Sequence, residues 1–472
     1  MFSFKILRST SATVCLLLLA TLSVYLFADE KSIMESRSLA QTYQKQGNYR
    51  DAWQIYQKLA VQANNPDAGV VHDLQQGIAC LQQLNRISEM DEFRESVLKV
   101  HANQPLVLWK LAESYIQGPH YGYIIDGEFI RGHQRGGNRF INTHEQDRLI
   151  ALKLMNQAIE KLKNGDDAEL ASNIYFDTAE YYLSGREGQN AWKLQILTDL
   201  NETPDFASVG AEPGSFFRGG PSGGPEGAPV DDAGDPVYYR VPASFETAKN
   251  DGERWRWMLD QCVKQNHERQ AEVILQVADF NRSQFGVQTL QNFMPYFFSQ
   301  RNEPDPQDEE QVNPYSLESL KETETLTRLA TGIQRINLPD DLNYIRLYQQ
   351  VVELGKSNWG ENALGQLVSI FENRRQYPTA AKYLRQSIAE YGDPHQNKQQ
   401  QLNQIVGNWG QFDPNPSQVA GQGAEVDYRF RNGQHVEFEA YQIHVEKLLT
   451  DVKTISKPTR KNWNGTRSIF RT

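Results

Sequence analysis

The sequence predicts a mainly α-helical protein built as an α-solenoid, with long inserted loops and a small C-terminal β-hairpin followed by a helix. Apolar side chains recur at helical spacing in several segments between Leu39 and Leu384. These segments form helix pairs, and a pair of this kind cannot bury its apolar stripe alone, so it must stack on its neighbours. Alternation of apolar and charged residues replaces the helical spacing only after Phe412.

Composition limits the class of protein. The chain has 472 residues, 39% of them hydrophobic, and a formal net charge of -11. This apolar content argues against a multi-span membrane protein, and the aromatic content argues against wholesale disorder. The acidic balance gives no reason to expect nucleic acid as a partner, because phosphate binding needs clustered Lys and Arg. Three cysteines exclude a disulfide scaffold, and Cys80 and Cys262 are expected to be buried.

The N-terminus has the sequence pattern of a signal peptide or signal anchor. Residues 9–28 hold no charge and follow Lys5 and Arg8, which is typical of a signal peptide or a signal anchor. Twenty residues just reach the ~30 Å of a hydrocarbon core, so length does not separate these two alternatives. We expect residues 1–28 to export the chain or anchor it in the membrane. Because the positive flank stays inside, the following residues would lie outside the cytoplasm, in the periplasm or cell envelope.

The first repeat begins soon afterwards. One helix-turn-helix unit accounts for the spacing of Leu39, Ala40, Tyr43, Gly47, Tyr49, Ala52, Tyr56 and Leu59. Leu39 and Tyr43 share a face of a first helix, Gly47 sits at the break, and Ala52 and Tyr56 share a face of a second. This pattern resembles a tetratricopeptide repeat, which is informative about fold and uninformative about chemistry.

Further units are less regular. A second copy runs from Leu364 to Leu384, with Arg375 where the turn glycine would be. Residues 108–115 predict a first helix and residues 151–158 its second helix, separated by an insertion. Helical faces are also predicted at 255–263, 271–278 and 326–333.

The predicted order of segments follows from these patterns. It comprises a signal peptide or anchor (1–28), repeats with an insertion at 118–146 (30–209), a Gly/Pro-rich loop (210–245), more helical repeats (246–412), a β-hairpin and helix (413–455) and a disordered basic tail (456–472). Within the Gly/Pro-rich loop, residues 210–236 hold eight glycines and five prolines.

The C-terminal hairpin rests on an Asn-Gly turn. Residues 426–430 and 436–440 alternate apolar with polar side chains on either side of Asn432 and Gly433, which is the strongest short-range hairpin signal. A helix is expected from about Ile443 to Val452. The last twenty residues hold six basic and no acidic side chains, which suggests a disordered tail or a truncated or frameshifted end.

One insertion stands out as a candidate partner-binding site. Aromatic and basic residues alternate with glycines between Tyr121 and Phe140. Guanidinium groups stack on aromatic rings and form forked hydrogen bonds to carboxylates, so this loop could contact a partner or instead cap the inner face of the solenoid. The candidate contact residues are Tyr123, Arg131, His133, Arg135 and Arg139.

Catalytic, cofactor and metal motifs are not apparent. The sequence has no P-loop, no Gly-x-Ser-x-Gly elbow and no His-Glu-x-x-His helix. We therefore expect a non-enzymatic scaffold without cofactors, whose partners are proteins. Two alternatives stay open: a hydrolase or peptidase with His133, His144 or His267 as general base, and a cell-envelope assembly adaptor.

Several stretches together resemble one family. These are the export segment, the tetratricopeptide-like start, Tyr238–Pro242 leading to Asn250–Trp257, and Val436–Ala440. They look like the N-terminal helical region of large bacterial alpha-2-macroglobulin-family proteins, which are endopeptidase inhibitors. The resemblance implies extracytoplasmic protein partners, proteases among them. The family's bait and thioester regions are missing from this sequence, so we expect a truncated relative that keeps only the helical platform.

Overall fold

The computed structural model describes residues 31–133, 139–162, 167–186, 188–202, 227–286, 316–413, 425–439 and 443–455, together with Gly421 and Gly423. The chain divides into two compact units, Met1–Gly392 and Asp393–Thr472. The sequence predicts a segment boundary at 412/413. The second unit begins earlier, at Asp393, and therefore includes the helix Asn397–Val406 together with the C-terminal strands.

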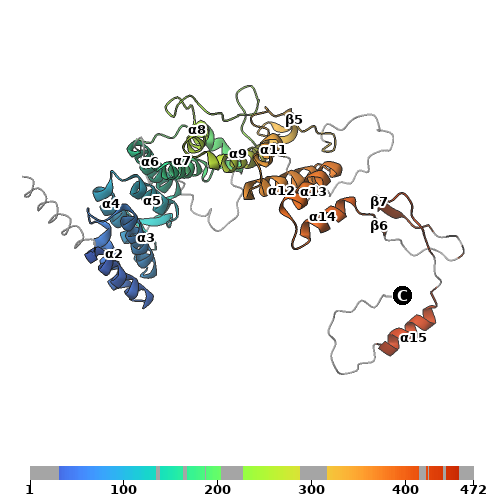
Figure 1. Cartoon of the computed structure of the whole chain (residues 1–472), viewed down its shortest axis with the longest axis horizontal. Coiled ribbons are helices and arrows are strands. Elements are labelled where there is room, and N and C mark those ends of the chain that lie inside the picture. Colours follow the sequence, from blue (N-terminus) through green and yellow to red (C-terminus); the bar gives the residue numbers. More distant parts are fainter. Residues whose placement is uncertain are drawn as a thin grey trace, which may run out of the picture. The chain divides into compact units, whose positions relative to one another are not determined.

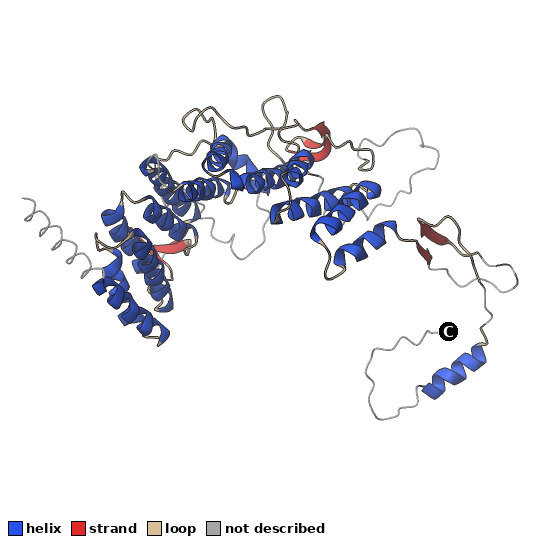
Figure 2. Cartoon of the chain, in the orientation of Figure 1, coloured by secondary structure: helices blue, strands red, loops and turns tan. Residues whose placement is uncertain are grey.

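The first unit is a stack of helix pairs, shown in sequence order by the colours of Figure 1. Residues 31–45 are helical and lead into α2. The following helices are α2 (Tyr49–Ala60), α3 (Asp67–Gln83), α4 (Met90–His101), α5 (Pro105–Ile116), α6 (His144–Lys161), α7 (Ala168–Leu183), α8 (Asp251–Gln265), α9 (Gln270–Phe285), α11 (Tyr344–Glu353), α12 (Asn358–Asn373) and α13 (Tyr377–Tyr391). Among the described residues, three short 3-10 helices join them: η1 (Ile87–Glu89), η2 (Gly188–Gln195) and η3 (His267–Arg269). The predicted mainly α, tetratricopeptide-like architecture is confirmed, and Figure 2 shows how few strands accompany the helices.

Long insertions separate the two helices of three successive pairs. Helix α5 packs on α6, α7 on α8, and α9 on α11. The sequence predicted the first of these interruptions at 118–146 and part of the second as the Gly/Pro-rich loop at 210–245, but it did not show that the second separates the two helices of one pair. Helices α8 and α9 are adjacent in sequence, and their apolar faces do not indicate which helix each one packs against.

The turns within pairs share one geometry. Gly47, Asn85 and Arg375 have φ values of 81°, 55° and 56°. In each case the next residue's N–H donates to the carbonyl five residues back: Asn48 to Tyr43 (2.8 Å), Arg86 to Leu81 (2.9 Å) and Gln376 to Phe371 (2.8 Å). This is the helix-terminating arrangement that favours glycine. The turn predicted at Arg375 is therefore present, at a conformational cost.

First helices of neighbouring pairs also contact one another. The Trp109 indole on α5 donates to Asp177 on α7 (2.8 Å). Gln276 on α9 donates to Glu180 on α7, and Arg282 on α9 to Ser369 on α12 (3.1 Å). The interior is lined by buried apolar side chains from both helices of each pair. Burial of these stripes between pairs supplies the main stabilisation of such an array.

The segment 326–333, predicted as helix, is a β-hairpin. Strand β4 (Glu324–Leu329) pairs with β5 (Gly332–Asn337) in antiparallel register. Leu326, Leu329 and Ile333 fit helical spacing, but burial alternates along β4 with Thr325, Thr327 and Leu329 inside. The hydroxyl of Thr325 donates to the Phe285 carbonyl (2.6 Å) at the end of α9. This hydrogen bond to a carbonyl at the end of α9 favours the strand over a helix. The sequence near Thr325 gives no sign of this distant partner.

Part of the predicted Gly/Pro-rich loop is ordered against this hairpin. Ala228 N–H donates to Arg328 O (2.8 Å), and Ala330 N–H donates to Ala228 O (2.9 Å). Residues 210–226 of that loop lie outside the described residues. The insertion after α7 is therefore joined to the insertion after α9 by backbone hydrogen bonds.

The second unit contains α14 (Asn397–Val406), β6 (Trp409–Phe412), β7 (Tyr428–Arg431) and α15 (Val445–Ile455). A strand pair and a following helix are present as predicted, but the pairing differs. Strand β7 pairs with β6, and the described residues 436–439 form no strand with it. Asn432 has φ 59° and its amide donates to Ile405 O (2.8 Å) and Gly407 O (2.9 Å). It therefore caps α14 instead of turning a hairpin, a role that depends on a helix distant in sequence.

Within the described part of the chain, no helix combines the length and apolarity needed to cross a membrane. Residues 9–28, which are predicted to reach the membrane, lie outside the described part of the chain, and so does the predicted basic tail at 456–472.

Candidate interaction site on the inserted sheet

The insertion between α5 and α6 folds into a three-stranded sheet. Strands β1 (Tyr121–Ile125), β2 (Glu128–Arg131) and β3 (Arg139–Asn142) are antiparallel in the order β2-β1-β3. Gly122 lies opposite Arg131 and Ile141, whereas Tyr123 lies opposite Ile130 and Phe140. Directly opposed residues share a face of an antiparallel sheet. The register therefore places the candidate residues on two different faces of the sheet.

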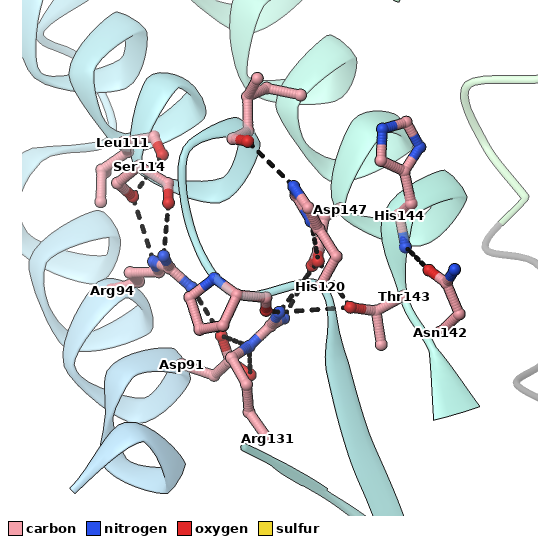
Figure 3. Close-up of polar contacts among 12 residues, drawn as sticks. Asp91, Arg94, Leu111, Ser114, His120, Arg131, Asn142, Thr143, His144 and Asp147 are labelled. Carbon is pink, nitrogen blue, oxygen red and sulfur yellow. Dashed lines mark hydrogen bonds and ion pairs between the residues drawn. The ribbon is translucent and has the colours of Figure 1, made fainter. Parts of the chain in front are cut away.

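The inner face places Arg131 between two carboxylates, as Figure 3 shows. Its Nε donates to Asp91 Oδ2 (2.8 Å) on α4, and its Nη2 donates to Asp147 Oδ1 (2.7 Å) on α6. Nη1 donates to Asp147 Oδ2 (2.9 Å) and to the Pro119 carbonyl (2.6 Å). Only 4% of Arg131 is exposed. The guanidinium thus ties the insertion to the second helices of two successive pairs.

Asp147 has two further hydrogen-bond partners, His120 and Thr143. His120 Nδ1 lies 2.9 Å from Asp147 Oδ2, and the Thr143 hydroxyl donates to the same oxygen (2.6 Å). Burial raises the pKa of Asp147, but hydrogen bonds from His120, Arg131 and Thr143 outweigh it and hold that pKa below its ordinary value. Asp147 is therefore the ionised centre of the network.

His120 connects this centre to α5. Its Nε2 lies 2.9 Å from the Ile116 carbonyl oxygen, which can only accept. Its Nδ1 faces the ionised Asp147, which also only accepts. His120 therefore bridges the carboxylate of Asp147 to the last turn of α5.

Arg94 closes the network on α4 and α5. Its side chain pairs with Asp91 (2.9 Å), its Nε donates to the Ser114 hydroxyl (3.1 Å), and its Nη2 donates to the Ser114 carbonyl (2.5 Å). The guanidinium also lies 4.3 Å from the Tyr115 ring centroid. Burial lowers the pKa of Arg94 despite the charge of Asp91. A buried polar network with this many satisfied donors rigidifies the elements that it joins.

The outer face of the sheet carries aromatic rings. Tyr123 lies 5.7 Å from Phe140 and 6.2 Å from His133, and Tyr121 lies 6.3 Å from Phe140, between ring centroids. Phe140 is 43% exposed, and the two tyrosines are partly exposed. We call Tyr121, Tyr123, His133 and Phe140 the aromatic face. Such rings on a rigid platform suit protein recognition, since aromatic residues are enriched at interface cores.

The predicted site residues divide accordingly. Tyr123 and His133 meet on the aromatic face. Arg131 points inward and its guanidinium is occupied by Asp91 and Asp147. Arg139 is exposed on β3 opposite Ile124. Arg135 lies outside the described residues.

Sequence reasoning missed Asp91, His120 and Asp147. Asp91 precedes Arg131 by 40 positions, and no spacing rule links a carboxylate on one repeat to an arginine in the next. The only available signal was that an arginine in an aromatic strand requires a counter-ion if it is buried.

Buried arginines also fasten the other two insertions. Arg148 donates to Tyr181 O (2.8 Å) at the end of α7 and pairs with Asp251 (3.4 Å) at the start of α8. Asp251 in turn accepts from Thr198 N–H (2.9 Å) beyond η2. Arg374 at the end of α12 donates to Lys321 O (3.0 Å) and Glu324 O (2.9 Å) beside the β4–β5 hairpin.

The histidines proposed for a hydrolase have no catalytic setting in the described residues. His144 stacks edge-on with His120 (5.0 Å), and His133 with Tyr123. No hydrogen bond joins the imidazoles of His133, His144 or His267 to a Ser, Cys or carboxylate side chain there. Cys80 and Cys262 are free and buried, as expected, and burial raises the pKa of Cys80 to about 11. A thiol with that pKa is a poor nucleophile.

A family model of the tetratricopeptide repeat matches residues 37–68. The matched segment contains the end of the first helix, the Gly47 turn and α2. A search of curated proteins finds no match to the chain. The tetratricopeptide-like region is therefore established for the first repeat, and the stacked helix pairs extend the helical-repeat fold beyond it.

Proposed function

We propose that this protein is a scaffold for protein–protein interaction, in which the helical repeats hold the aromatic face as a docking surface. The observation that carries the proposal is the contrast between the two faces of the inserted sheet. The inner face is fixed by the ion pairs of Arg131 to two repeats. The outer face leaves aromatic rings partly exposed. A pre-organised surface binds with little ordering cost.

Paired substitutions test this function. In capture experiments followed by mass spectrometry, Tyr123→Ser with Phe140→Ser should lose partners that the wild-type chain retains. Trp359→Ser is the matched control, because Trp359 is a 39% exposed aromatic on α12, away from the insertion. An identical set of partners for the double variant and the wild type would overturn the assignment of this face. Partners lost equally in the control would show that general surface apolarity accounts for capture.

We further propose an extracytoplasmic location and partners that include proteases or cell-envelope proteins. Support comes from the uncharged segment 9–28 and from the resemblance to the helical region of alpha-2-macroglobulin-family proteins. Enrichment of extracytoplasmic proteases in the capture experiment would support the inhibitor-related role. Enrichment of envelope assembly proteins alone would favour the adaptor. The nucleotide sequence downstream of codon 453 provides a second test, because macroglobulin domains encoded there would mark the chain as part of an inhibitor.

A further inference from the structure

The β4–β5 hairpin has one covered edge and, among the described residues, one open edge. At the covered edge, Ala228 N–H donates to Arg328 O (2.8 Å) and Ala330 N–H donates to Ala228 O (2.9 Å). On the side of β5 that faces away from β4, no backbone group of the described residues donates to the strand or accepts from it. Strand β5, labelled in Figure 1, lies at the surface, and Ile333 on it is 46% exposed. The hairpin therefore presents unpaired backbone groups along one strand.

The hydrogen-bonding pattern shows which β5 residues face outward. In an antiparallel pair, every second residue exchanges hydrogen bonds with the residue opposite it, and the residues between point the other way. Leu338 N–H donates to Thr323 O (2.9 Å), so the odd-numbered positions of β4 bond to β5. The hydrogen bond of Arg328 O to Ala228 agrees, because it places an even-numbered position facing away from β5. The β5 residues opposite the even-numbered positions direct their N–H and C=O groups away from the hairpin: Ile333, Arg335 and Asn337.

This edge lacks the features that usually protect an exposed strand. Proteins shield such edges with lysine, proline or a β-bulge. Strand β5 contains no lysine and no proline, and its register with β4 runs through six consecutive pairs without a bulge. Its one charged side chain, Arg335, is held by Glu324 (2.6 Å) and by the Ser319 hydroxyl (3.0 Å). The edge is thus regular enough to accept another strand.

We propose that β5 docks an extended segment of a partner protein, which adds a strand to the hairpin. The site is separate from the aromatic face and does not depend on it. Donors and acceptors that repeat at every second residue match an extended backbone. Directly opposed residues share a face, so side chains of the added strand meet Ile333 and Arg335. An apolar residue opposite Ile333 and an acidic residue opposite Arg335 complement this edge.

A second copy of the chain fits the edge less well. In an antiparallel pair of two β5 strands, the register that uses all three outward residues places Arg335 of one copy opposite Arg335 of the other. Like charges directly opposite each other destabilise a strand pair. Each chain also carries a net charge of -11, which opposes association of two copies. The occupant is therefore an acidic, strand-forming segment of a different protein.

Hydrogen–deuterium exchange of the full chain, read at single residues, tests the open edge. The amides of Gln334 and Ile336 point to β4 and should exchange slowly, whereas those of Ile333, Arg335 and Asn337 should exchange rapidly. Slow exchange at all three outward amides would overturn the proposal, because another part of the chain would then cover the edge.

Selection of a displayed library of random decapeptides on the full chain tests docking. Enriched peptides should combine apolar and acidic residues and should slow exchange at the three outward amides. Ile333→Pro removes an outward N–H but no bond to β4, so these peptides should bind it about tenfold more weakly, the loss expected for one hydrogen bond. Ile333→Val is the matched control, because it keeps the N–H and the branched side chain, and should leave binding nearly unchanged.

Slow exchange of Gln334 and Ile336 in Ile333→Pro checks that the hairpin is intact, and Asn337→Pro is a second variant of the same kind. Three outcomes would overturn the proposal: no enriched peptide, equal binding to the wild type and both proline variants, or an equal loss of binding in Ile333→Val. A dimer in sedimentation velocity that Ile333→Pro dissociates would overturn it in favour of a second copy of the chain.

Discussion

Arg131 and Arg139 belong to the same inserted sheet, yet their surroundings differ. Arg131 is buried between Asp91 and Asp147, and Arg139 is exposed. Taking a guanidinium out of water costs several kcal/mol, and well-aligned carboxylates offset that cost. The two arginines, which the sequence grouped together as contact residues, therefore have separate consequences for stability.

Arg131→Met should lower the free energy of unfolding by about 3–5 kcal/mol, because it leaves the buried carboxylate of Asp147 and the part-buried carboxylate of Asp91 without their shared cation. Urea denaturation followed by circular dichroism measures this. Arg139→Met is the matched control and should change stability by less than about 0.5 kcal/mol. Similar effects of the two substitutions would show that the network contributes little.

Asp147 makes the network sensitive to acid. Its pKa in the folded protein lies below its ordinary value, so the unfolded chain takes up the proton first as the pH falls. The stabilisation is complete above the unfolded pKa of about 3.9 and is lost as the pH falls through the folded pKa. The stability difference between the wild type and Asp147→Asn should therefore be constant from pH 7 to 5 and shrink below about pH 4. A difference that grows on acidification would contradict this sign.

At the scale of the element, the turn between α12 and α13 and the β4–β5 hairpin depend on adjacent arginines. Arg375 adopts φ 56° and its side chain makes an exposed ion pair with Glu318 (3.3 Å). Arg374 is buried and binds carbonyls next to the hairpin. The side chain of Arg374 is therefore required for these contacts. The position of Arg375 requires only a backbone with positive φ.

Arg375→Gly should raise the free energy of unfolding by about 1 kcal/mol, because glycine adopts this backbone conformation without strain. The exposed ion pair that is lost is worth little. Arg385→Gly in the middle of α13 is the control of opposite sign and should lower stability by about 1 kcal/mol. Destabilisation by Arg375→Gly would mean that the side chain outweighs the strain.

Arg374→Met should release the β4–β5 hairpin while leaving the helix pairs in place. Three hydrogen bonds from its guanidinium, to Lys321 O, Glu324 O and the Tyr344 hydroxyl, would be lost. Hydrogen–deuterium exchange should rise in residues 316–343 and change little in α5 and α6, and Arg375→Met should leave both regions unchanged. Equal protection of the hairpin in both variants would contradict the anchoring role.

At the scale of the whole molecule, the first unit is a one-dimensional array. Each helix pair contacts its neighbours, and stability in such arrays is the sum of local and nearest-neighbour contributions. We therefore expect Arg131→Met to increase exchange in residues 105–161, with little change in α12 and α13. Uniform loss of protection across residues 31–391 would instead indicate one cooperative unit.

The sequence by itself determined the repeat class, the helix-turn-helix start and the insertion between α5 and α6, because these depend on spacing within one or two helices. Tertiary structure decided the rest. The spacing of apolar residues predicted a helix where strand β4 forms. The strand is favoured because the Thr325 hydroxyl donates to a carbonyl at the end of α9. Asn432 capped α14 instead of turning a hairpin. Arg131 turned inward because Asp91 and Asp147 come from two different repeats. In each case the deciding partner is remote in the chain, and a local pattern carries no information about it.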